Sequence, residues 1–77
     1  MESVTRVIPR DDFTMELWFD TGDHRIFAVR PYLNRGVFAR LQDLAMFKQA
    51  LVALDTVCWP GNIDIAPETH YDRSRPA

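Results

Sequence analysis

The strongest constraint on the fold is a strict alternation of large apolar residues in the first quarter of the chain. They occupy every second position: Phe13, Met15, Leu17 and Phe19. Side chains of a β-strand point alternately to its two faces, so the pattern predicts a strand over 13–19 with one face against a core. Trp18 falls on the opposite face. It either packs beneath another segment or marks a partner-binding site, because aromatic residues are enriched at interface hot spots.

Two further strands are predicted on either side of this one. Residues 4–8 are rich in β-branched side chains and end at a turn cluster that begins with Pro9. Residues 20–23 form a four-residue connection in which Gly22 can adopt positive φ, and an apolar run follows over 24–29. The strand at 13–19 and the run after it therefore predict an antiparallel hairpin.

The middle of the chain allows two interpretations. Apolar residues up to Leu51 fit one helical face, whereas Ala50, Val52 and Leu54 alternate as in a strand. Asp43 is a suitable N-cap, and β-branched residues become frequent only afterwards. We favour a short helix over 44–48 followed by strands near 50–54 and 56–59, with one helix over 38–54 as the alternative.

Length and composition indicate a single small domain. A chain of 77 residues buries only about 60% of the surface that it exposes when unfolded. Its 47% hydrophobic content is too high for a disordered tail. We predict one compact α+β domain over 2–73 and a frayed tail at 74–77. The expected architecture is a small antiparallel sheet of about four to five short strands, a short central helix and a short C-terminal helical turn.

Charge and cysteine content restrict the environment and the partners. The net charge of −2 gives no overall attraction to a polyanion. Cys58 is the only cysteine, so no intramolecular disulfide can form and a reducing compartment is expected. No window approaches the roughly 18 apolar residues of a membrane span, and the N-terminus has no apolar run of signal-peptide length. We expect a soluble cytoplasmic protein without a membrane partner.

Several short motifs in a fixed order carry a family resemblance. They are LWFDTG at 17–22, PYL at 31–33, GVF at 36–38, TVCWP at 56–60, and the residues Leu41, Phe47, Asp64, Ile65, Pro67, Glu68 and Tyr71. Through them, over roughly residues 2–73, the chain resembles the small bacterial family known as domain of unknown function 2442. The resemblance implies a small α+β domain with antiparallel strands and no established activity. Some relatives are fused to a helix-turn-helix or encoded beside another small protein in a toxin–antitoxin-like arrangement.

The segment 59–71 is expected to close the fold. After Trp59, the order Gly61-Asn62 favours a type II′ turn over the type I′ turn of the family's Asn-Gly. Pro67 is predicted to begin the C-terminal helical turn, and Tyr71 to pack back on the domain.

Asp64 is the residue of this segment that we single out. Ala66 precedes Pro67 and cannot cap a helix, so we expect Asp64, buried between two isoleucines, to accept backbone hydrogen bonds from 67–69. A small-ligand site around Asp64, His70 and Tyr71 is the alternative.

Motifs for catalysis or metal binding are not found in the sequence. His24 and His70 lack a second strong ligand at helical spacing, and Cys58 lies in an apolar run where a structural role is expected. There is no Gly-x-Ser-x-Gly motif and no phosphate-binding glycine loop. We therefore expect no cofactor, no metal and no enzymatic activity.

The function predicted from these observations is a protein-binding or regulatory module, antitoxin-like or self-associating. The first alternative is a nucleic-acid-associated accessory domain. It would use arginines that recur every five residues in a region free of acids: Arg25, Arg30, Arg35 and Arg40. A solvated surface is the simpler interpretation of that spacing. The second alternative is the ligand site around Asp64 and Tyr71.

Overall fold

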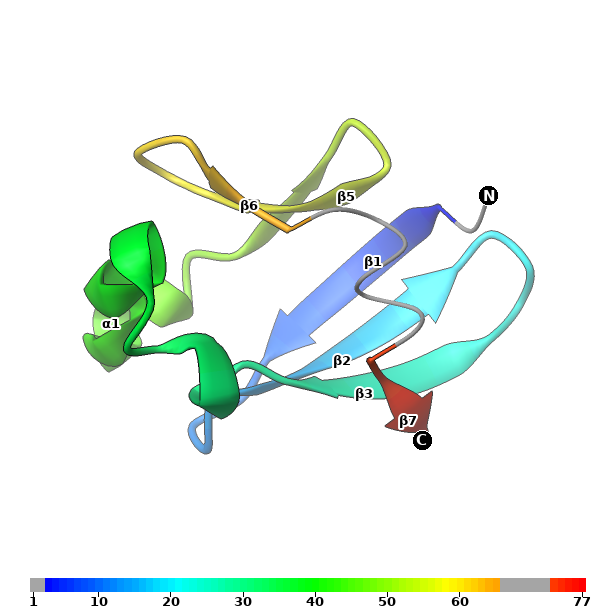
Figure 1. The fold of residues 1–77 in the computed structure, drawn as a ribbon. Helices are drawn as coiled ribbons and strands as arrows, with labels where there is room; N and C mark the ends of the chain where they lie inside the picture. The colour runs from blue at the N-terminus through cyan, green and yellow to red at the C-terminus, as the bar shows by residue number, and fades with distance from the viewer. Residues whose placement is uncertain (1–2, 66–72) are drawn as a thin grey trace.

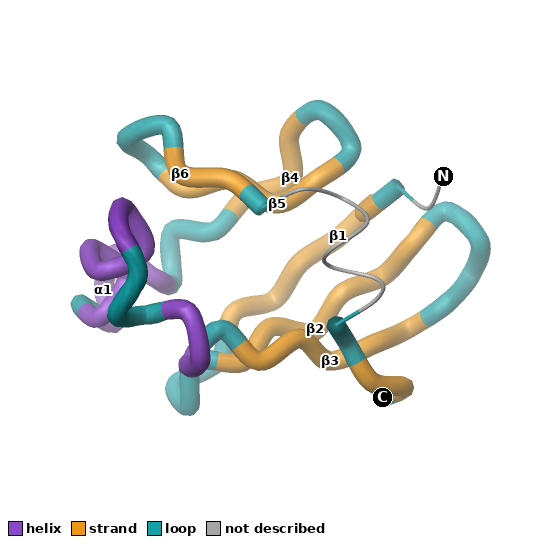
Figure 2. Tube along the Cα trace, viewed as in Figure 1, coloured by secondary structure: helices purple, strands orange, loops and turns teal. Residues whose placement is uncertain are grey.

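The computed structural model describes residues 3–65 and 73–77, which form two small antiparallel sheets and a few helical turns (Figures 1 and 2). The first sheet has the order β1-β2-β3-β7 and the second the order β4-β5-β6. The strands are β1 (Val4–Pro9), β2 (Thr14–Phe19), β3 (His24–Ala28), β4 (Leu51–Ala53), β5 (Thr56–Trp59), β6 (Ile63–Asp64) and β7 (Arg75–Pro76). Between β3 and β4 lie two 3₁₀ segments and a short helix: η1 (Arg30–Tyr32), η2 (Gly36–Gln42) and α1 (Leu44–Phe47).

The predicted architecture is right at the level of class and wrong in detail. The mixture of antiparallel strands with a short central helix agrees with α+β. The described residues, however, form two sheets instead of one, with seven strands in total. Arg75 and Pro76, in the segment predicted to fray, pair with β3 as its outer neighbour (Figure 1). The predicted C-terminal helical turn lies outside the described residues.

The first two hairpins share one loop geometry. In the β2–β3 hairpin the Phe19 N–H bonds the Asp23 carbonyl and the Gly22 N–H bonds the Phe19 carbonyl, so the loop has three residues instead of the predicted four. Gly22 takes φ +91° at the position of this loop that requires the left-handed region. In the β1–β2 hairpin Phe13 holds the same position with φ +64°. The strand predicted to begin at Phe13 therefore begins one residue later, at Thr14.

The middle of the chain is a helix followed by a strand. The Asp43 side chain accepts a hydrogen bond from the Ala45 N–H at 3.0 Å, which confirms its predicted role as N-cap of α1. β4 and β5 then pair antiparallel, as the rise in β-branched residues predicts. The interpretation of residues 38–54 as one helix is wrong.

The core lies between the two sheets and under the helical segment. Its buried side chains are Val4, Met15, Leu17, Phe19, Phe27, Val29, Leu41, Phe47, Val57, Trp59, Ile63 and Ile65. Trp59 joins the second sheet to α1, because its Nε1 donates to the Phe47 carbonyl at 2.8 Å. The Thr56 hydroxyl donates to the Ile65 carbonyl and holds the end of β6 against β5.

Two turns of the second sheet contain residues in the left-handed region. Leu54 and Asp55 form the two-residue β4–β5 turn with φ +52° and +68°, and Leu54 is 93% exposed. After Trp59, Gly61 has φ +92° and Asn62 has φ +63°. Because both values are positive, the type II′ turn predicted for these residues, which has one positive φ, is not formed.

Candidate functional site

The most developed surface is the face of the first sheet that points away from the core, which we call the outer face. Residues paired directly across neighbouring strands lie on the same face of a sheet. The register Arg6–Trp18–His24 forms one row across β1, β2 and β3, and Ile8–Glu16–Ile26–Arg75 forms the next row across all four strands. Arg10 joins the outer face through its ion pair with Glu16. Thr14 and Ala28 form a third row, and Asp12 joins it by accepting hydrogen bonds from Thr14. The outer face thus comprises Arg6, Ile8, Arg10, Asp12, Thr14, Glu16, Trp18, His24, Ile26, Ala28 and Arg75.

Trp18 is held at the centre of the first row. The His24 ring stacks on the indole with centroids 4.3 Å apart and planes 10° from parallel. The Arg6 guanidinium carbon lies 4.8 Å from the indole centroid. Because β1 and β3 flank β2 on opposite sides, Arg6 and His24 cover opposite faces of the ring. The indole is therefore fixed in orientation, with its edge left for contact.

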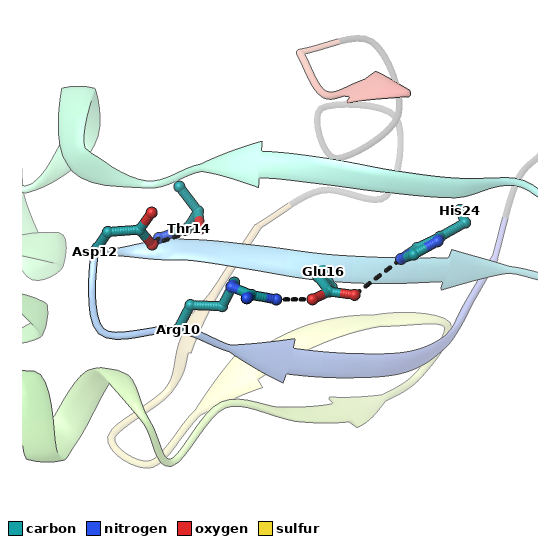
Figure 3. Close-up of polar contacts among 5 residues, drawn as sticks. All are labelled: Arg10, Asp12, Thr14, Glu16 and His24. Carbon is teal, nitrogen blue, oxygen red and sulfur yellow. Dashed lines mark hydrogen bonds and ion pairs between the residues drawn. The ribbon is translucent and has the colours of Figure 1, made fainter. Parts of the chain in front are cut away.

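Glu16 connects the second row to the first and to the turn. Its carboxylate forms an ion pair with Arg10, and its Oε2 lies 3.0 Å from His24 Nε2 (Figure 3). The Glu16 side chain is 19% exposed, whereas that of Arg10 is 52% exposed. Such exposed pairs contribute little to stability, but they orient Arg10 and His24 around a shielded carboxylate.

The acidic residues at the ends of the first sheet are engaged locally. Asp11 pairs with Lys48 at 2.7 Å, and Asp20 accepts from the Ser3 N–H at 3.2 Å. Asp12 accepts from both the hydroxyl and the N–H of Thr14, and these hydrogen bonds lower the pKa of its carboxyl (Figure 3). Residues 8–12 line an open hollow of about 500 Å³ beside Ile8 and Arg10.

The predicted site residues are separated by the structure. Trp18 lies half-buried on the outer face, whereas Trp59 is a core residue. Asp64 is exposed in β6, so the expectation that it is buried is wrong. The hydrogen bonds predicted from 67–69 to Asp64, and the roles of Pro67, His70 and Tyr71, fall outside the described residues.

Asp64 instead faces the thiol across the second sheet. Cys58 pairs with Asp64 in the register of β5 and β6. Burial raises the pKa of the Cys58 thiol, and the nearby Asp64 carboxylate raises it further. A hollow of about 370 Å³ runs along this edge, lined by residues 58–64 together with Leu54. A thiol with a raised pKa is a poor nucleophile at neutral pH, which agrees with the structural role predicted for it.

The four regularly spaced arginines lie in different surroundings. Arg25 pairs with Leu17, a core residue, and its guanidinium donates to the hydroxyl and the carbonyl of Ser74. Arg30 and Arg35 are exposed and lie over the rings of Phe13 and Tyr32, at 5.5 and 5.7 Å from the centroids.

Arg40 is exposed in η2, where its guanidinium lies beside Gly61. Of the four arginines, Arg25 bonds the residue before β7, and β7 pairs with β3.

Arg6, Arg10, Glu16, His24 and Arg75 were not selected by the sequence interpretation. The alternation over residues 13–19 places Glu16 on the same outward face as Trp18, so the position of Glu16 could have been predicted from the sequence. The face of the sheet on which His24 lies depends on the length of the β2–β3 loop. A four-residue loop would pair it with Phe19 on the core face, but the three-residue loop pairs it with Trp18 and turns it outward.

Within residues 3–65 and 73–77, no group of three or more His, Cys, Asp or Glu side chains is placed to hold a metal ion. The helices in that part of the chain are all too short or too polar to cross a membrane.

The fold and the outer face define a small two-sheet α+β domain with an exposed, aromatic and cationic sheet surface. The chain matches the family model described as "Protein of unknown function (DUF2442)" over residues 4–76. It belongs to this family, in agreement with the motifs quoted above. No curated protein and no solved structure gives a significant match.

Proposed function

We propose that this protein is a non-enzymatic protein-binding module that contacts its partner through the outer face. The observation that carries the proposal is the row Arg6–Trp18–His24, in which an exposed indole edge is held between two cationic or polar side chains. Tryptophan and arginine are the residues most enriched at interface hot spots. An aromatic side chain that is already immobilised loses little conformational entropy when a partner binds.

Solvent-exposed apolar side chains next to this row support the same function. Ile8 is 36% exposed and Ile26 is half-buried, and they flank Glu16 in the neighbouring row. Aromatic residues and arginine are enriched at protein interfaces, and Trp18 with the arginines around it agrees with this composition. We include a regulatory, antitoxin-like role in this proposal, because such a role can be carried out by protein binding without catalysis.

The experiment is recovery of the partner from the native cell with tagged protein. Trp18→Ala should reduce the stoichiometric recovery of the partner, because it removes the centre of the outer face. Val37→Ala is the matched control: it also truncates an exposed apolar side chain, 53% exposed, but in η2. Light scattering on the purified protein tests whether the partner is a second copy. If the Trp18 variant and the control recover the same proteins in the same amounts, the proposal is wrong.

A further inference from the structure

We propose that the outer face recognises an acidic polypeptide segment; this inference names the partner class and therefore rests on the proposed function. The first observation is that the outer face and the rest of the molecule carry net charges of opposite sign. The outer face carries three arginines, Arg6, Arg10 and Arg75, and two carboxylates, Asp12 and Glu16, so its net charge is +1 with His24 neutral. The whole chain carries −2. The remainder of the molecule is thus acidic, and the outer face has the opposite sign.

The distribution of side chains within the outer face favours a negative partner. Both carboxylates already have partners: Glu16 is the most shielded member of its ion-pair network and faces Arg10 and His24, and Asp12 accepts hydrogen bonds from Thr14. Arg6 and Arg75 are exposed, and they lie toward opposite edges of the sheet, on β1 and β7. A segment that crosses the strands meets Arg6 and Ile8 on the edge strand β1, then Glu16 and Ile26, and finally Arg75 on β7 at the other edge. Electrostatic complementarity of this kind accelerates association and selects against basic partners.

The arrangement of the indole favours a polypeptide over a nucleic acid. Proteins that bind single strands without sequence preference stack bases on open aromatic faces. Here both faces of the Trp18 ring are covered, by Arg6 and by His24. A base can stack only if one of them is displaced, whereas a carboxylate side chain can contact the arginines with the row intact.

Poly-L-glutamate and poly-dT with equal numbers of charges are suitable probes. Each polymer is titrated into the protein at about 20 mM salt, and binding is followed by tryptophan fluorescence. Trp59 is only 2% exposed, so a change on binding reports Trp18. We expect poly-L-glutamate to bind more tightly than poly-dT, and its binding to weaken strongly at about 0.3 M salt, where the Debye length falls to roughly 6 Å. Absence of binding at low salt, or tighter binding of poly-dT, would overturn the inference.

Paired variants with the same change in net charge locate the site. The double substitution Arg6→Gln with Arg75→Gln should weaken poly-L-glutamate binding at least about threefold, as expected for the loss of two exposed charge contacts. The control, Arg35→Gln with Arg40→Gln, removes two exposed arginines from the helical segment and should leave the affinity near that of the wild type. Arg6→Lys retains the charge and should retain binding. Equal weakening in both double variants would show that only net charge matters and contradict the inference.

The two proposals can fail separately. If Trp18→Ala abolishes recovery of the native partner while Arg6→Gln with Arg75→Gln has no effect on it, the outer face binds a protein that is not acidic. If the polymer results are as expected but Trp18→Ala retains the native partner, the outer face binds polyanions without being the partner interface.

Discussion

The imidazole of His24 lies parallel to the indole of Trp18, with ring centroids 4.3 Å apart and planes 10° from parallel. The two residues are directly paired in the β2–β3 ladder, and their contact depends on the three-residue loop closed by Gly22. The stack therefore links a turn conformation in the backbone to the shape of the proposed interface.

Removal of the imidazole should expose one face of the indole. In His24→Ala we expect greater quenching of tryptophan fluorescence by acrylamide, while stability falls by less than about 1 kcal/mol because the pair is partly solvated. Trp59 is buried and contributes a constant background, and Trp18→Phe measures that background directly. Unchanged quenching in His24→Ala would mean that the rings are not stacked in solution.

Substitutions in the β4–β5 turn should stabilise the protein. Leu54 and Asp55 both have positive φ, as in a type I′ turn, for which Asn-Gly is preferred. Leu54 is 93% exposed, so its replacement sacrifices almost no packing. We expect Leu54→Asn with Asp55→Gly to raise the free energy of unfolding by about 1 kcal/mol, and Tm by roughly 4–8 °C.

Leu54→Ala is the control for this turn, because alanine meets the same backbone penalty as leucine and should leave Tm nearly unchanged. A lower Tm in the Asn-Gly variant would show that the turn does not have this conformation in solution.

Trp59 should be the most sensitive position of the second sheet. Trp59→Phe removes the hydrogen bond to the buried end of α1 and leaves a space beside Phe47, whose ring centroid lies 6.2 Å away. We expect a loss of about 2 kcal/mol, measured by denaturant unfolding. Trp18→Phe is the matched substitution on the surface and should cost clearly less. Equal losses at the two positions would contradict the assignment of Trp59 to the core.

The reactivity of Cys58 should depend on Asp64. Burial and the Asp64 carboxylate both raise the pKa of the thiol, so the thiolate fraction at pH 8 is smaller than for an ordinary cysteine, and alkylation by iodoacetamide should be slow. Asp64→Asn removes a negative charge, lowers the pKa and should accelerate alkylation at constant pH.

Asp11→Asn, in the distant β1–β2 turn, serves as the control for charge alone and should have no effect on this rate. If Asp64→Asn leaves the rate unchanged and the far-ultraviolet spectrum intact, the electrostatic effect of Asp64 on the thiol is absent.

Local patterns were sufficient for most of the secondary structure. The alternation from Phe13 to Phe19, the N-cap at Asp43 and the rise in β-branched residues after Leu51 are each governed by neighbours in the sequence, and each matches a described element. Family membership also follows from short motifs in order, and the family model confirms it.

The pairing of strands that are distant in the sequence could not be predicted from local patterns. Nothing local to Arg75 and Pro76 indicates a strand, because their partner in β3 lies about 50 residues earlier in the chain. The division into two sheets has the same origin: strand order depends on which segments bury their apolar faces together, and several orders satisfy the same alternation.

The sequence by itself therefore determined most of the elements, the core-facing positions of β2 and the exclusion of Trp18 from the core face. The tertiary structure alone decided what surrounds Trp18. A single residue of loop length turns His24 from the core to the outer face, because side chains alternate along a strand. Pairing with β1 and β7 then brings Arg6 and Arg75 to the same surface, where three separate segments of the chain complete the proposed interface.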